Sequence, residues 1–153
     1  MEKREIRKIL VPVDGSNPSF DAASLAIEVA KRFGAQLQVL HVVKIDQSLR
    51  ALGLIGTSYS NFVEKSMEGA RKEADAWFER IHKEGEAFGV AVNANVVDTS
   101  ISVVGEITNY AEKNEIDLIV MGTKGLSGFT KLLMGSVATG VVQYAPCPVL
   151  TVR

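Results

Sequence analysis

Apolar and polar residues follow two recurring patterns along this chain. Five short apolar or alternating runs predict β-strands at residues 9–13, 37–43, 90–97, 116–121 and 148–152. Four longer stretches, in which apolar residues recur every three or four positions, predict helices at residues 17–33, 61–88, 103–111 and 134–144. Strands that alternate with helices favour an α/β fold, in which helices cover both faces of a parallel sheet.

The predicted helices are bounded by residues that suit helix ends. Asn17 is expected to cap the first helix, with Pro18 at its first helical position, and Gly34 is expected to end it. Gly89 closes the second helix, and the segment 99–102 can cap the third.

Parallel α/β sheets bind ligands beyond the carboxyl ends of their strands. The residues in those places are Asp14, the segment 43–46, Asp98 and the segment that starts at Gly122. Asp14 and Asp98 can also serve as turn residues that accept a local N–H bond. The connections 44–60 and 123–133 are long for a compact domain, which is typical of segments with a function of their own or some disorder.

Composition narrows the class of protein. The 153 residues fit one domain, 1–153, and 17 basic against 18 acidic residues give no basic excess for nucleic acid. Residues 1–8 are charged and lack the apolar core of a signal peptide, and no apolar run approaches the roughly 18 residues of a membrane helix. Cys147 is the only cysteine, which fits a reducing compartment. We therefore expect a cytoplasmic enzyme or binding protein without a membrane partner.

Glycines gather after the fourth predicted strand, at positions 122, 125, 128 and 135. Phosphate binding requires backbone N–H groups that converge on an anion, and a helix N-terminus supplies such donors. Ser136 would start the last helix, where it can cap the helix or donate to a phosphate. Neither standard phosphate motif is present, so a flexible glycine-rich turn is the alternative.

The spacing of Gly122, Gly125, Gly135 and Ser136 is G-x2-G-x9-G-[ST], which resembles the ATP-binding signature of universal stress proteins. The segments 9–16, 118–123, 135–138 and 145–150 are also similar to that family. The resemblance covers nearly the whole chain and is weakest over 44–60. It implies a Rossmann-like fold of the adenine nucleotide alpha hydrolase-like type, with five parallel strands in the order 3-2-1-4-5 and helices on both faces.

The resemblance also implies a nucleotide pocket with a phosphate loop over residues 122–136. The residues that it assigns to adenine and ribose are Pro12, Val13, Asp14 and Val42, with Met121 and Gly122 beside the ribose and the first phosphate. The residues that it assigns to the phosphates are Gly125, Gly135, Ser136 and Val137. A side chain at Gly125 or Gly135 is expected to block the phosphates or to demand forbidden backbone angles.

Two positions depart from the family pattern. Ala138 stands where some ATP binders have a hydroxyl residue, and Leu126 stands where the family often has arginine. Both changes weaken the expected hold on the phosphates, for which Lys124 and Lys131 can compensate.

No residue is an evident catalyst. His41, inside the second strand, is expected to be packed and hydrogen-bonded, and Cys147 to be a small buried side chain. No His, Cys, Asp or Glu residues have metal-ligand spacing, and G-x-S-x-G is absent.

The expected function is that of an ATP-binding stress or signalling switch that binds ATP with Mg²⁺ and turns it over slowly or not at all. The alternative is a slow nucleotide hydrolase or an adenylate-transferring enzyme, although the usual loop of adenylating relatives is missing after the first strand. An interaction subunit without a ligand is a third possibility, which the intact glycines oppose.

A homodimer is expected through the C-terminal strand. In the 3-2-1-4-5 order this strand lies at an edge of the sheet, and the apolar run 148–152 can pair with a second copy. A monomer protected by Arg153 and the C-terminus is the alternative.

Overall fold

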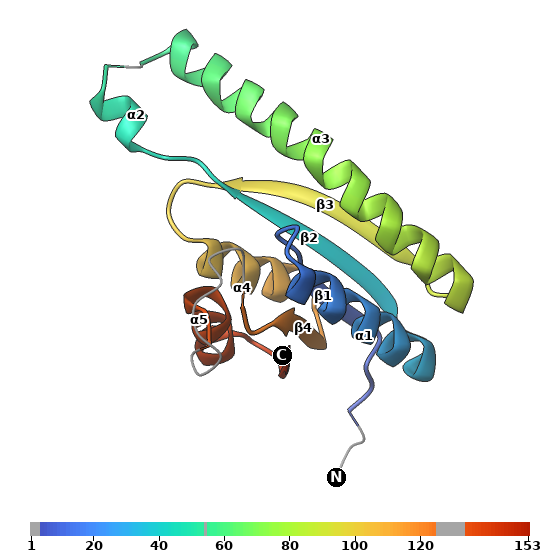
Figure 1. The fold of residues 1–153 in the computed structure, drawn as a ribbon. Coiled ribbons are helices and arrows are strands. Elements are labelled where there is room, and N and C mark those ends of the chain that lie inside the picture. The colour runs from blue at the N-terminus through green and yellow to red at the C-terminus, as the bar shows by residue number, and fades with distance from the viewer. Residues whose placement is uncertain (1–3, 54, 125–133) are drawn as a thin grey trace.

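The computed structural model describes residues 4–53, 55–124 and 134–153 (Figure 1). The strands of the structure are β1 Lys8–Pro12, β2 Gln36–Lys44, β3 Val92–Thr99, β4 Leu118–Gly122 and β5 Val149–Val152. The helices are α1 Asn17–Phe33, α2 Ser48–Ala51, α3 Thr57–Phe88, α4 Val103–Lys113 and α5 Ser136–Tyr144. The predicted alternation of strands and helices is confirmed. The short helix α2 and the earlier start of α3 lie within the connection 44–60, for which no helix was predicted.

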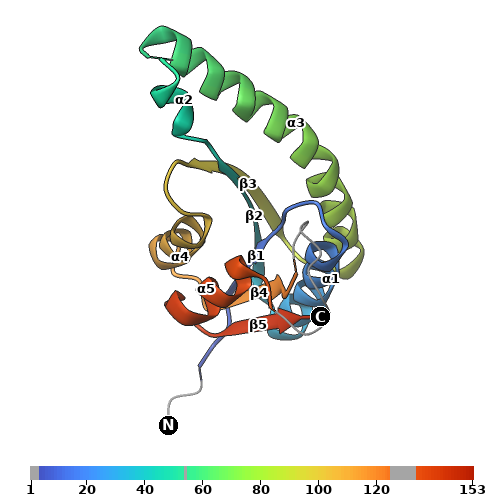
Figure 2. The ribbon, with the colours of Figure 1, turned by 60° about the vertical axis from the view of Figure 1, so that its left-hand side comes forward.

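The five strands form one parallel sheet in the order β3-β2-β1-β4-β5, as expected. Figure 2 shows the sheet between two helical layers, with α1 and α3 on one face and α4 and α5 on the other. The start of α3 and all of α2 extend past the carboxyl ends of β2 and β3. None of the helices that the structure describes is long and apolar enough to cross a lipid bilayer.

Side chains of the central strands alternate between two apolar cores because successive strand residues point to opposite faces. Ile9 and Val11 of β1 pack under α1 and α3, whereas Leu10 between them packs under α4 and α5. In β4, Ile119 and Met121 join Leu10 on the α4 and α5 side. The central strands are therefore continuous apolar runs in the sequence, as expected for a sheet that is covered on both faces.

The cap of α1 differs from the sequence prediction. The N-cap is Ser16, whose hydroxyl oxygen accepts a hydrogen bond from the Ser19 backbone N–H at 3.3 Å, and Asn17 is already helical. Serine and asparagine are both favourable N-cap residues, so the cap is set by the position at which the helix begins after β1. The predicted end of the helix is confirmed, since Gly34 adopts a left-handed conformation with φ 67°.

Helices α4 and α5 approach each other closely at Gly140. A Cβ atom at this position would lie 2.7 Å and 2.9 Å from the two methyl carbons of Val104. Because ordinary carbon contacts are about 3.5–4.0 Å, only glycine fits between the helices at this separation. The contact fixes α5 against α4 and thereby places the N-terminus of α5.

Candidate functional site

A pocket of about 340 Å³ opens at the carboxyl ends of β1, β2 and β4. Strands β1 and β4 are neighbours in the sheet, but the helices that follow them, α1 and α5, lie on opposite faces. This divergence leaves a crevice at the carboxyl edge, which is where open α/β sheets bind their ligands. The volume suits a small organic ligand.

Nine of the ten residues assigned to the nucleotide from sequence line this one pocket. They are Pro12, Val13, Asp14, Val42, Met121, Gly122, Gly135, Ser136 and Val137. The tenth, Gly125, lies outside the described residues, as do Leu126 and Lys131. The structure thus brings together segments that are more than a hundred positions apart, and their contact with a nucleotide stays a prediction.

Eight further residues line the pocket, and among them only Lys124 and Ala138 were placed near the phosphates from sequence. They are Ser19, Leu40, His41, Val103, Ile107, Thr123, Lys124 and Ala138. Leu40 lies on the α4 face of the sheet, and Val103 and Ile107 lie on α4 itself, which has no sequence motif that marks it as a pocket wall. Their apolar side chains give one side of the pocket a surface that suits a flat aromatic ring.

Asp14 supports the turn that follows β1. Its Oδ1 atom accepts hydrogen bonds from the Ser16 backbone N–H, at 3.0 Å, and from the Ser16 hydroxyl. The turn role that the sequence allowed is therefore present, and the same residue lines the pocket. The carboxylate sits beside the N-terminus of α1, where a negative charge is favourable.

The N-terminus of α5 faces the pocket through Gly135, Ser136 and Val137. The Gly135 N–H donates to the Thr123 carbonyl at 2.6 Å, which ties the start of α5 to the end of β4. Among the described residues no side chain caps this helix, and Ser136 is its first helical residue, so Ser136 is not the cap that sequence allowed. The uncapped N–H groups of the first turn can bind an anion.

The backbone of Gly135 corrects one expectation. Its φ of -59° and ψ of 156° are open to any amino acid, so a side chain at this position meets no forbidden angles. The remaining reason for glycine is close approach of a ligand to the backbone. Gly122 has a further, structural reason, since a Cβ atom there would lie 3.0 Å from three atoms of Pro18 at the start of α1.

His41 is packed and hydrogen-bonded, as predicted. Its Nδ1 atom lies 2.8 Å from the Val13 carbonyl oxygen, which can only accept, so Nδ1 carries the proton. The ring also lines the pocket. Among the described lining residues the charged groups are Asp14 and Lys124, one of each sign.

The signature residues Gly122, Gly135 and Ser136 all line this one pocket. The model of the universal stress protein family matches residues 5–153. The chain belongs to the universal stress protein family. This assignment agrees with the strand order and with the resemblance seen in the sequence.

Individual relatives support the assignment. Universal stress protein MJ0531 of Methanocaldococcus jannaschii is 35% identical over 147 residues, which are 96% of this chain and 82% of the relative. The solved structure of universal stress protein UspA from Lactobacillus plantarum has a TM-score of 0.74 at 26% identity and covers 99% of this chain and 100% of its own.

Two solved structures share the fold and carry nucleotides. One is a universal stress protein in complex with cAMP, with a TM-score of 0.72, 20% identity and coverage of 97% of this chain and 98% of its own. The other is the universal stress protein from Archaeoglobus fulgidus in complex with dAMP, with a TM-score of 0.60, 18% identity and coverage of 99% and 100%. At these identities the likeness shows the shared fold alone.

Proposed function

We propose that this universal stress protein binds ATP together with Mg²⁺ and acts as a nucleotide-dependent stress or signalling switch with little or no turnover. The observation that carries the proposal is the meeting of the signature residues Gly122, Gly135 and Ser136 around one pocket at the carboxyl edge of the sheet. The cAMP and dAMP complexes of two proteins with this fold support an adenine nucleotide as the ligand class.

The two ends of the pocket suit the two ends of a nucleotide. Val42, Val103 and Ile107 offer an apolar wall for the adenine ring. The uncapped N-terminus of α5 and the side chain of Lys124 offer donors and positive charge for the phosphates. Mg²⁺ would arrive with the triphosphate, and Asp14 is the acidic residue among the described lining residues that can meet it.

Slow turnover is proposed because the described lining has one cation, Lys124, and no side chain assigned to hold water at the γ-phosphate. Hydrolysis of a triphosphate needs a group that orients or activates water, and usually a cation at the γ-phosphate. Asp14 uses one oxygen on Ser16, and His41 uses Nδ1 on the Val13 carbonyl. These bonds hold both side chains in the turn after β1, and they leave the second Asp14 oxygen and the unprotonated Nε2 of His41 able to accept a proton.

Titration calorimetry with MgATP tests the proposal. The wild-type chain should bind MgATP, and Gly135→Val should lose binding while its circular dichroism stays unchanged, because φ and ψ at Gly135 accept valine. Gly69→Val is the matched control, since Gly69 is exposed on α3 and a Cβ atom there meets nothing within 4 Å. A wild-type chain that binds no MgATP would overturn the function. Unchanged affinity in Gly135→Val would overturn the site.

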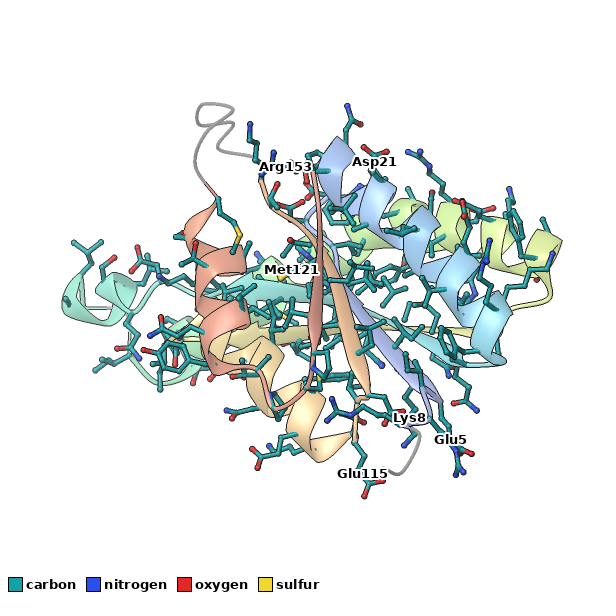
Figure 3. The ribbon with its side chains drawn as sticks, turned by 90° about the horizontal axis from the view of Figure 1, so that it is seen from below. Glu5, Lys8, Asp21, Glu115, Met121 and Arg153 are labelled. Atoms are coloured by element: carbon teal, nitrogen blue, oxygen red, sulfur yellow. The ribbon has the colours of Figure 1, made fainter. Side chains whose placement is uncertain are left out.

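The proposal includes a homodimer through β5 and a cytoplasmic location. Strand β5 is the last in the sheet order, so its outer edge has no neighbour among the described strands. Figure 3 looks onto this strand, with α5 on one side, α1 on the other and Arg153 at its end. Leu150 on β5 and Val142 and Tyr144 on α5 are exposed apolar residues. An apolar, unpaired edge of this kind favours antiparallel pairing with a second copy. A single cysteine fits the cytoplasm.

A further inference from the structure

Helix α3 contributes no residue to the described lining of the pocket, yet its Trp77 contacts the lining residue His41 and the turn at Gly15. The indole lies against Gly15, next to Asp14 in the turn that follows β1. A Cβ atom at Gly15 would lie 2.4 Å, 2.7 Å and 2.9 Å from three atoms of the six-membered ring of Trp77. Gly15 also has φ 80°, so the turn depends on glycine both for its conformation and for this contact.

His41 holds the other side of the same turn. Its Nδ1–H donates to the Val13 carbonyl at 2.8 Å, and its ring meets the Trp77 ring edge to face, with centroids 5.1 Å apart and planes at 87°. This arrangement is a favoured geometry for two aromatic rings. The hydrogen bond fixes the peptide between Val13 and Asp14, because that carbonyl is the acceptor of the bond.

We propose that Trp77 and His41 are positioning residues that hold the Asp14–Gly15 turn in its nucleotide-binding shape. The proposal rests on the proposed function and adds that α3, from outside the pocket, sets the affinity of the site. Trp77 lies between the buried residues Ala74, Phe78 and Ile81, so the helix and the indole move as one packed unit. A shift of α3 then moves Gly15, and with it the Val13 and Asp14 walls of the pocket.

A pair of glycine variants separates the Trp77 contact from backbone strain. Gly15→Ala and Gly34→Ala both place alanine at positive φ, 80° and 67°, but a Cβ atom at Gly34 meets nothing within 4 Å. Calorimetry should show MgATP affinity falling about tenfold or more in Gly15→Ala, since a displaced wall costs at least one hydrogen bond to the ligand. Affinity in Gly34→Ala should stay within about twofold of wild type, inside the uncertainty of the measurement.

A second substitution relieves the clash. Trp77→Phe removes the six-membered part of the indole that faces Gly15. The double variant Gly15→Ala with Trp77→Phe should therefore bind MgATP more tightly than Gly15→Ala alone. Affinity that is lost in Gly15→Ala and not recovered in the double variant would overturn the role of Trp77.

Two variants at His41 separate the contribution of its hydrogen bond from the contribution of its ring. Asparagine can place an amide N–H where Nδ1 lies, whereas phenylalanine keeps a ring and loses the donor. His41→Asn should retain more of the wild-type affinity than His41→Phe, which leaves the Val13 carbonyl unpaired and should bind about tenfold more weakly. Equal affinities in these two variants would overturn the positioning role of the hydrogen bond.

The emission of Trp77 gives a readout that a purely structural role would not move. Trp77 is the only tryptophan, so tryptophan fluorescence reports the surroundings of this one indole. Saturating MgATP should change the emission of wild type and of Gly34→Ala, and the change should be smaller in His41→Phe. A wild-type chain that binds MgATP without any change in emission would overturn the link to α3. A wild-type chain that binds no MgATP in calorimetry would instead overturn the proposed function, and the positioning role with it.

Discussion

Two helix glycines should respond in opposite directions to the same substitution. Replacing glycine by alanine inside a helix stabilises it by about 1 kcal/mol, because alanine loses less backbone entropy. Gly69 on α3 is exposed and a Cβ atom there meets nothing within 4 Å. We therefore expect Gly69→Ala to raise the free energy of unfolding by about 1 kcal/mol.

Gly140 offers no such space. Its added Cβ atom would lie 2.7 Å and 2.9 Å from the methyl carbons of Val104, about 1 Å inside an ordinary contact. Val104 is β-branched and has one strongly preferred side-chain rotamer in a helix, so the helices must separate instead. Overpacking of this kind costs about 1–3 kcal/mol, which exceeds or cancels the gain in helix propensity. We expect Gly140→Ala to lower the free energy of unfolding by about 1 kcal/mol.

Urea denaturation followed by circular dichroism at 25 °C measures both changes. Val104→Ala provides the internal test, because removing the two methyl carbons should restore the stabilising effect of alanine at position 140 in a double-mutant cycle. Separation of α4 and α5 would also displace the N-terminus of α5, so Gly140→Ala should weaken MgATP binding while Gly69→Ala leaves it unchanged. If both alanine variants gain the same stability, the packing argument for α5 is wrong.

Three further predictions concern assembly, turnover and the thiol. Sedimentation of the wild type at micromolar concentration should give about twice the chain mass, and Leu150→Lys should shift it toward monomer by placing a charge on the edge of β5; a monomeric wild type would refute the dimer. Release of phosphate from MgATP should stay well below about 1 per second, the low end of ordinary turnover, and faster release would show that a catalytic group has been missed. Cys147, which was predicted to be buried, is half-buried, and this partial burial raises the pKa of its thiol, so less thiolate is present at any given pH. Its alkylation at pH 8 should be slower in the folded chain than in urea, and equal rates would contradict the burial.

Much of the site could be predicted because its residues follow buried strands directly. Asp14 follows β1 and Gly122 ends β4, and the parallel sheet brings these ends to one edge. The wall formed by Val103 and Ile107 was not predicted, since α4 reaches the pocket only through its packing on the sheet. Ala138 was identified from sequence as a departure from the family, and the structure places it in the pocket lining.

The sequence by itself determined the succession of strands and helices, the buried character of the central strands and the signature glycines. These features depend on local periodicity and spacing, which can be recognised without knowing which segments pack together in the fold. Only the structure showed three other features. They are the capping of α1 by Ser16 in place of Asn17, the allowed backbone angles of Gly135, and the placement of Trp77 against Gly15. The last of these depends on the packing of a distant segment. Trp77 contacts Gly15 only because α1 and α3 pack on the same face of the sheet, and no local pattern at either residue encodes that contact.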